Sequence, residues 1–264
     1  MLSVLDIFRI GIGPSSSHTV GPMRIARTFV RALAKAGKLE RTARIAVELQ
    51  GSLALTGVGH GTVDASILGL IGFAPDTTCP DEAAAALERV RTRGRLMLGG
   101  RQDIAFDPAT DIDLAGHVIP DLHPNGMQLA AFDADGAPLS RRTYYSTGGG
   151  FVASEAQLRR KPKDDRINTG TRVPHDFGSA EELLAECART DLSIAELILA
   201  NEDAFHPRER TLEGLDRIAA AMDQCVDRGL HQRGILPGGL KVARRAPDLW
   251  DKLSANPQSN EREQ

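Results

Sequence analysis

Polar side chains follow one another without interruption near the N-terminus, at Ser15, Ser16, Ser17, His18 and Thr19. The apolar spacing from Gly21 onward predicts that a helix begins directly after them. Free backbone N–H groups and the positive end of a helix dipole bind anions. Simple capping of the helix needs only one hydroxyl. The run of hydroxyls and an imidazole therefore favours a site for a carboxylate or a phosphate over a plain helix cap.

A second imidazole, His60, is flanked by Gly59 and Gly61, which leave it without neighbouring side chains. Neutral imidazole is suited to accepting a proton near pH 7, so His60 is a candidate general base. A helix is expected to begin just after it, at about Thr62. Taken alone, a glycine-rich stretch of this kind more often carries an ordinary surface histidine.

Two further stretches contain chemically useful groups. A turn at 123–126 holds His123 beside Asn125, and a loop of hydroxyls and glycines runs from Ser146 to Gly150. The loop follows a probable strand and is a candidate backbone nest for a carboxylate, although it fits neither the P-loop nor the GxGxxG spacing. Each of these signals is weak by itself.

The elements that must position these residues alternate in the first half of the chain. Apolar periodicity predicts helices from Gly21 to about Gly37, around 63–71 and over 81–93, and a strand at 43–49. The segment Ala134–Ala137 between 128–133 and 138–146 is typical of a β-hairpin turn. We therefore expect an α+β domain over residues 1–155.

The composition changes after residue 155. Residues 156–178 are predicted to form a solvated linker, because the polar and basic run 159–166 has no apolar period. Nucleic-acid binding is the competing interpretation, but aromatic residues are absent from the run and acidic residues interrupt it. Capping boxes at Ser179 and Ser193, followed by a helical pattern over 211–228, predict an all-α segment at 179–264. The polar stretch 257–264 is expected to be disordered.

The overall composition limits the function classes. The 264 residues are 41 % hydrophobic and 25 % charged, with a formal net charge of −3, which is typical of a globular protein without an electrostatic footprint for nucleic acid. No apolar run is long enough to span a membrane and the N-terminus lacks a signal-peptide core, so a cytoplasmic location is expected. The three cysteines suit neither a disulfide framework nor a metal knuckle, and we interpret them as reduced thiols.

Taken together, the motifs resemble those of the bacterial iron–sulfur L-serine dehydratases. The resemblance rests on Gly-Pro-Ser-Ser-Ser-His-Thr-Val-Gly-Pro-Met at 13–23, Gly-Ser-Leu-Ala-Leu-Thr-Gly-x-Gly-His at 51–60, His-x-Asn-Gly-Met at 123–127 and Tyr-Tyr-Ser-x-Gly-Gly-Gly-Phe at 144–151. It continues through Asn201-Glu202, Cys225-x-Asp-Arg-Gly, Leu236-Pro-Gly and Arg244-Arg-Ala. The similarity extends to about residue 248.

The resemblance implies an activity and a site. Members of the family deaminate L-serine to pyruvate and ammonia in amino-acid catabolism, with a 4Fe-4S cluster in place of pyridoxal phosphate. A cluster iron with an open site acts as the Lewis acid on the leaving hydroxyl. His60 matches the residue that is proposed as the general base in that family. The substrate pocket is expected to be lined by Ser15, Ser16, Ser17, His18, Thr19, Thr62, His123, Asn125, Ser146, Gly148 and Gly149. Residues 1–155 resemble the β domain of the family and 179–264 the start of its helical α domain.

One departure from the family pattern changes the expected role of the chain. The cysteines that ligate the cluster in the family have no counterpart here, and Cys187 and Cys225 do not match them. We therefore expect catalysis to need the missing part of the α domain or a second polypeptide, and the resemblance also suggests a homodimer. The alternative is a non-catalytic module that binds serine or a hydroxy acid, because the β domain resembles the allosteric substrate-binding domain of some phosphoglycerate dehydrogenases.

Overall fold

The computed structural model describes residues 2–8, 10–160, 171–236 and 241–255. Contacts divide these residues into two units. The sheet domain comprises 10–160 with 234–236 and 241–243, and the helical domain comprises 2–8, 171–233 and 244–255. The expected first domain, 1–155, included residues 2–8, which by contacts lie with the helical domain. Residues 161–170 of the predicted linker and the predicted disordered stretch 257–264 lie outside the described residues.

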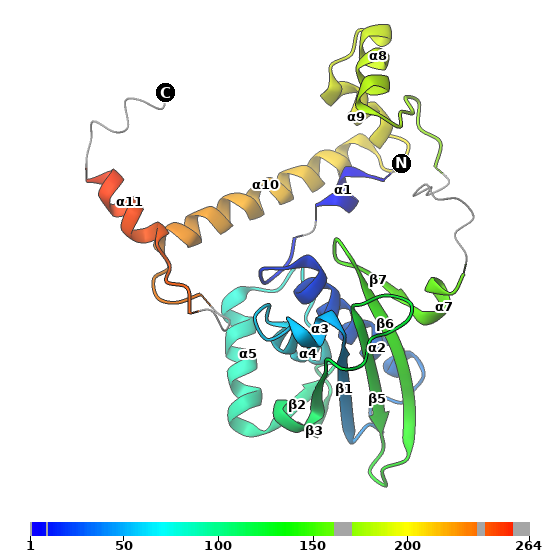
Figure 1. Cartoon of the computed structure of the whole chain (residues 1–264), viewed down its shortest axis with the longest axis vertical. Helices are drawn as coiled ribbons and strands as arrows, with labels where there is room; N and C mark the ends of the chain where they lie inside the picture. The colour runs from blue at the N-terminus through cyan, green and yellow to red at the C-terminus, as the bar shows by residue number, and fades with distance from the viewer. Residues whose placement is uncertain (1, 9, 161–170, 237–240, 256–264) are drawn as a thin grey trace. The chain divides into compact units, whose positions relative to one another are not determined.

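The sheet domain is built on a five-stranded sheet with the order β4-β1-β5-β6-β7 (Figure 1). Its strands are β1 (Arg44–Gln50), β4 (Ile112–Ala115), β5 (Gly126–Phe132), β6 (Pro138–Gly148) and β7 (Phe151–Ser154). Only the β1–β4 pair is parallel. A separate two-stranded sheet pairs β2 (Arg95–Leu98) with β3 (Gln102–Ala105).

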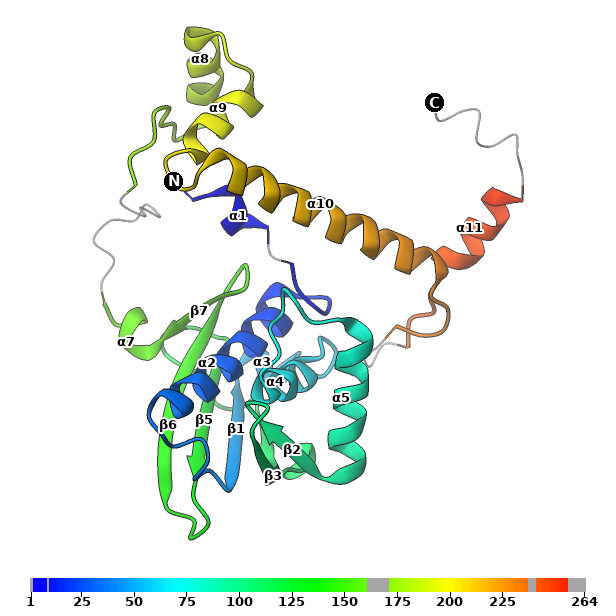
Figure 2. The ribbon, with the colours of Figure 1, turned by 180° about the vertical axis from the view of Figure 1, so that it is seen from behind.

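The helices of this domain are α2 (Gly21–Lys35), α3 (Ser52–Leu55), α4 (Thr62–Ile71), α5 (Pro80–Arg93), α6 (Pro108–Asp111) and α7 (Glu155–Leu158). Figure 2 shows α2 in front of the strands, on one face of the sheet. The apolar stripe of α2 explains this packing, since Met23, Phe29 and Leu33 are at most 2 % exposed within one core with the inward side chains of β1. Gly69 lets α4 approach α2, because a Cβ there would lie 2.3 Å from the carbonyl oxygen of Met23.

The helical domain contains α1 (Val4–Ile7), α8 (Ala180–Thr190), α9 (Ile194–Glu202), α10 (Arg208–His231) and α11 (Ala246–Ser254). The first residues of the chain are fixed to the end of α9, because the buried Glu202 carboxylate accepts hydrogen bonds from Ser3 Oγ at 2.7 Å and from the Val4 N–H at 2.8 Å. Gly214 of α10 allows the same segment to pack closely, since a Cβ there would lie 2.6 Å from a methyl group of Leu5.

The structure confirms a mixed α/β fold in the first part of the chain. The predicted helices, the strand at 43–49 and the hairpin around Ala134–Ala137 are present as α2, α4, α5, β1 and the β5–β6 pair. The short strands β2, β3, β4 and β7 were not predicted. The likeness to an allosteric substrate-binding domain stays a prediction. Among the residues that the structure covers, no helix is both long and apolar enough to cross a bilayer.

Candidate active site

The hydroxyl-rich loop forms one turn of π-helix, Ser16–Val20, that runs directly into α2. Ser15 caps this turn, as its Oγ accepts a hydrogen bond from the His18 N–H at 3.2 Å. Gly13 has a φ of +93°, and a Cβ there would lie 2.4 Å from a methyl group of Thr19. The loop therefore needs glycine at 13 to place the serines at the beginning of the helix.

His18 is held from both sides of its ring. Its Nδ1 shares a hydrogen bond of 2.9 Å with Ser17 Oγ, and its Nε2 shares one of 3.0 Å with Ser52 Oγ in α3. Its backbone carbonyl accepts a hydrogen bond of 2.7 Å from Thr62 Oγ1 at the start of α4. Burial, and secondly the positive charge that His60 can carry, lower the pKa of His18 below its ordinary value.

His60 lies beside His18, with ring centroids 5.0 Å apart and a tilt of 37°. Its Nδ1 lies 2.8 Å from the carbonyl oxygen of Thr56. Because a carbonyl oxygen only accepts, Nδ1 carries the proton in the neutral ring and Nε2 keeps its lone pair. Thr19 Oγ1 donates to the backbone carbonyl of His60 at 3.0 Å. This arrangement leaves Nε2 of His60 as the ring nitrogen that is able to accept a proton.

Residues of β6 and of the turn before β5 are hydrogen-bonded to the loop that contains His18. The buried Ser146 donates through Oγ to the carbonyl oxygen of Ser17 at 2.7 Å, and Asn125 Nδ2 donates to the carbonyl oxygen of Ser146 at 3.1 Å. The Asn125 N–H in turn donates to Nδ1 of His123 at 3.2 Å. Burial lowers the pKa of His123. A chain of hydrogen bonds therefore connects His123 to the hydroxyl-rich loop at residues 15–19, which we call the serine loop.

The glycine loop lies at the end of β6. Gly148 and Gly149 have φ values of +95° and +55°, and the carbonyl oxygen of Gly150 accepts a hydrogen bond of 2.7 Å from Arg24 Nη1 in α2. The positive φ values favour glycine at these positions. Arg24 thus ties this loop to the helix that follows the serines.

The structure separates the predicted site residues by what their side chains contact. Thr19, Thr62 and Ser146 donate to the carbonyl oxygens of His60, His18 and Ser17, so they position the site's backbone. The exposed Ser16 hydroxyl makes no hydrogen bond to any residue that the structure describes. Ser52, Thr56 and Arg24 were not predicted as site residues, although the first two lie in the glycine-rich stretch that contains His60.

The described residues do not fit an iron–sulfur cluster. No group of three or more His, Cys, Asp or Glu side chains that could hold a metal ion occurs among them. Cys79, Cys187 and Cys225 are free thiols within that part of the chain. Clusters of this type are held by several cysteine thiolates at one site. The sheet domain therefore offers histidines and hydroxyls for binding and proton transfer, and no ligand set for the cluster.

Comparison with known proteins finds relatives that match most of this chain. The L-serine dehydratase of Streptomyces coelicolor is 46 % identical over 252 residues, which are 96 % of this chain and 55 % of that protein. L-serine dehydratase 1 of Escherichia coli is 40 % identical over 264 residues, with 97 % and 57 % covered. This chain spans about half the length of these relatives. Residues 3–157 match the family described as "Serine dehydratase beta chain", and the chain belongs to that family.

Proposed function

We propose that this chain provides the substrate-binding and proton-transfer part of an L-serine dehydratase. The observation that carries the proposal is the orientation of His60, whose Nδ1–H is engaged by Thr56 and whose Nε2 is left as a base beside the serine loop. The relatives named L-serine dehydratase support the choice of substrate. We assign binding of the carboxylate group of the substrate, L-serine, to the N–H groups and hydroxyls of Ser15, Ser16 and Ser17.

The proposed reaction is a β-elimination. Nε2 of His60 accepts the Cα proton, the electron pair of that C–H bond forms the Cα–Cβ double bond, and the Cβ–O bond breaks so that hydroxide leaves with its electron pair. The protonated His60 ring returns its proton to the hydroxide, which gives water and the neutral imidazole. The resulting aminoacrylate tautomerises to the imine, and hydrolysis gives pyruvate and ammonium. His18, which burial keeps uncharged, shares hydrogen bonds with Ser17 and Ser52 and so fixes the serine loop against α3.

The leaving hydroxyl needs assistance that the described residues do not supply. The family resemblance assigns this role to a 4Fe-4S cluster, and the residues here do not fit one. We infer that the ligands belong to the portion of the relatives that this chain does not span, supplied as a continuation or as a second polypeptide. The many exposed apolar side chains of the helical domain, including Met222, Val226 and Trp250, support a missing partner segment.

The test combines this chain, under anaerobic conditions, with the uncovered part of the Streptomyces coelicolor relative and measures pyruvate formed from L-serine. We expect turnover in the wild-type complex and a loss of at least about 100-fold in His60→Ala. His117→Ala, which removes an exposed histidine elsewhere in the sheet domain, serves as the matched control and should leave turnover unchanged. Normal turnover in His60→Ala would exclude His60 as the base.

A non-catalytic binding module is the second candidate. It is favoured by one observation, that the hydrogen-bonded residues from Ser15 to Gly150 all lie within the sheet domain. Calorimetric titration of the chain alone with L-serine, combined with the turnover measurement on the complex, distinguishes the two proposals. Binding without turnover in the reconstituted complex supports the module, and turnover in that complex rules it out.

A further inference from the structure

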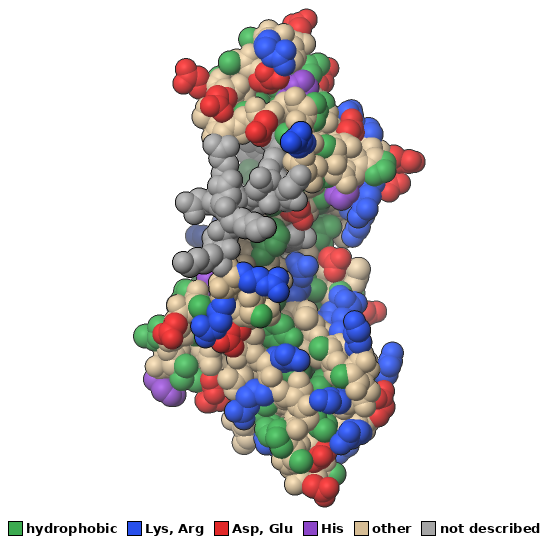
Figure 3. Space-filling model, turned by 90° about the vertical axis from the view of Figure 1, so that its right-hand side faces the viewer, with side chains coloured by type: hydrophobic (Ala, Val, Ile, Leu, Met, Phe, Trp, Pro, Cys, Tyr) green, Lys and Arg blue, Asp and Glu red, His purple; other side chains and the backbone are tan. Residues whose placement is uncertain are grey.

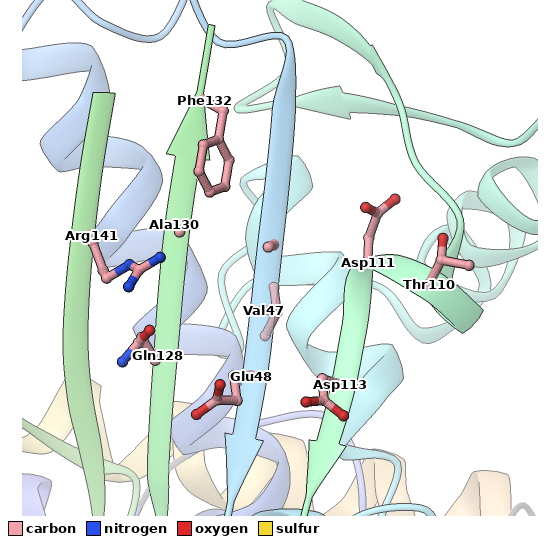
Figure 4. Close-up of a pocket in the computed structure, with 10 residues that line it drawn as sticks. Val47, Glu48, Thr110, Asp111, Asp113, Gln128, Ala130, Phe132 and Arg141 are labelled. Atoms are coloured by element: carbon pink, nitrogen blue, oxygen red, sulfur yellow. The ribbon is translucent and has the colours of Figure 1, made fainter. Parts of the chain in front are cut away.

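The face of the sheet opposite the core carries a shallow hollow over β4, β1, β5 and β6 (Figure 4). No residue of the histidine site lines it. Along β1 the side chains alternate, so that Val47 packs in the core while Ala46 and Glu48 take the other face. The small side chains of Ala46 and Ala130, which are register partners, leave the space between the larger polar residues.

Opposite charges line the two sides of this hollow. One row of paired residues crosses three strands, because Glu48 of β1 pairs with Asp113 of β4 on one side and with Gln128 of β5 on the other. Arg141 of β6 pairs with Ala130 in the adjacent row. Figure 4 shows Arg141 and Glu48 extending toward β5 from the strands on either side of it. Acidic groups therefore lie on one side, a guanidinium on the other, and a carboxamide between them.

These charges are not neutralised by one another. The strands β6 and β1 are two strand spacings apart, which is about 10 Å. Arg141, Asp113 and Gln128 form no ion pair or side-chain hydrogen bond with another residue in the described part of the chain, and Glu48 accepts only from Gln50 Nε2, at 2.6 Å. Donors and acceptors are therefore available to a ligand that reaches both sides.

We propose that this hollow binds a small zwitterion, an α-amino acid, at a site separate from the histidine pair. The carboxylate of the ligand binds the Arg141 guanidinium and the Gln128 carboxamide, and its ammonium group binds Glu48 and Asp113. A simple anion would meet the two carboxylates and a simple cation would meet Arg141, so the charge pattern selects a ligand with both charges. The alanine floor suits a small side chain.

One wall of the hollow also restricts the ligand. Phe132 closes the end of the hollow near the start of β1, and the guanidinium of Arg44 is stacked over its ring at 4.1 Å from the centroid. This cation–π contact occupies both groups. Arg141 is therefore the guanidinium left to bind the carboxylate in this hollow, as far as the described residues extend.

The probe is L-alanine, which has both charges and no hydroxyl to eliminate. Backbone amide NMR of the chain during titration should show shifts at Ala46 and Ala130. Arg141→Gln should weaken this binding about tenfold or more, because it removes a charge-assisted pair. The matched control is Arg142→Gln, since Arg142 pairs with the core residue Leu129 and so takes the opposite face of the same strand. Its effect should be less than twofold.

Ligands with one charge test the selection. Propionate and ethanolamine should each bind at least about tenfold more weakly than L-alanine. Absence of shifts at Ala46 and Ala130 up to the solubility of L-alanine would overturn the proposal, as would equal binding by Arg141→Gln with an unchanged unfolding midpoint. Shifts confined to residues 15–19 and 60–62 would assign amino-acid binding to the histidine site instead. His60→Ala should leave the shifts at Ala46 unchanged, so this result is independent of the proposed elimination.

Discussion

The imidazole rings of His18 and His60 lie 5.0 Å apart, although the two residues come from separate loops. Each ring is oriented by a different partner, Ser52 Oγ for His18 and the Thr56 carbonyl for His60. Two positive charges at this distance repel each other, and burial disfavours the charged form of His18 further. The pair is therefore built to keep His18 uncharged at neutral pH.

The titration of His18 follows from this contact. We expect its pKa below 6.5, the ordinary value, and a rise toward that value in His60→Ala, because the repulsive charge is removed while burial remains. NMR titration of the ring protons measures both values. His117→Ala is the control and should leave the titration of His18 unchanged.

The same shift predicts how folding stability depends on pH. The unfolded chain binds a proton at His18 more readily than the folded chain does. The contribution of His18 to the free energy of unfolding is therefore fully present above pH 6.5, and it decreases as pH falls from 6.5 through the lower pKa of the folded chain. Urea unfolding at several pH values should show this loss in the wild type. A His18→Gln variant that loses stability equally over this interval would contradict the assignment.

Gly21 is expected to be essential for the contact between the serine loop and β6. A Cβ at this position would lie 2.0 Å from Ser146 Oγ, which donates to the carbonyl of Ser17. Gly21→Ala should destabilise the sheet domain by about 1 to 3 kcal/mol through overpacking. Gly59→Ala is the control, since its Cβ would meet only Thr56 O at 3.7 Å. Thermal unfolding that is equal for the two variants would argue against this contact.

Glu202 is expected to stabilise the helical domain through the N-terminal residues. Glu202→Ala leaves the Ser3 hydroxyl and the Val4 N–H without their acceptor, which should cost about 1 to 3 kcal/mol. A double-mutant cycle with Ser3→Ala, measured by urea unfolding, isolates the pair. Additive effects of the two substitutions would show that the contact contributes nothing. Glu209→Ala removes an exposed carboxylate of the same domain and should have little effect.

Glu186 in α8 predicts an acid-sensitive contact. Hydrogen bonds from Arg189, and then from His175, lower the pKa of this carboxyl to about 2. A carboxyl whose pKa is lowered by folding contributes stability above its ordinary pKa of 4.5, and this contribution is lost as pH falls from there toward about 2. Carbon-detected NMR should find the low pKa in the wild type and a higher one in Arg189→Gln. An unchanged pKa in that variant would exclude Arg189 as the main cause.

The apolar face of α10 is expected to be covered when the partner segment is present. Met222 and Val226 are 51 % and 61 % exposed, and Cys225 lies on the same side of the helix. Adding the uncovered part of a relative should slow alkylation of Cys225 and leave exposed Cys79 as reactive as before. Met222→Glu with Val226→Glu should abolish the protection, whereas Ala220→Glu with Gln224→Glu, on the opposite face, should retain it.

Local patterns predicted the parts of the fold that local interactions determine. The stripe of α2 and the turn before β6 are encoded within a few residues, and both are present. Pairing of β4 with β1 could not be predicted, because the short run Ile112–Ala115 obtains its place from a parallel partner more than sixty residues away. The role of Ser52 was missed for the same reason, since its partner His18 lies 34 positions away. Thr56 lies only four positions from His60, but it contributes a backbone carbonyl oxygen, which every residue has and which gives no signal in the sequence.

The bond between Ser3 and Glu202 also sets an order of events during synthesis. These residues are separated by 199 positions, and residues 10–160, which contain the core of the sheet domain, lie between them in the sequence. A chain made from its N-terminus exposes residues 3–8 long before their acceptor leaves the ribosome, while the sheet domain can fold as soon as β7 is complete. Residues 3–8 are therefore made early and find their native contacts late.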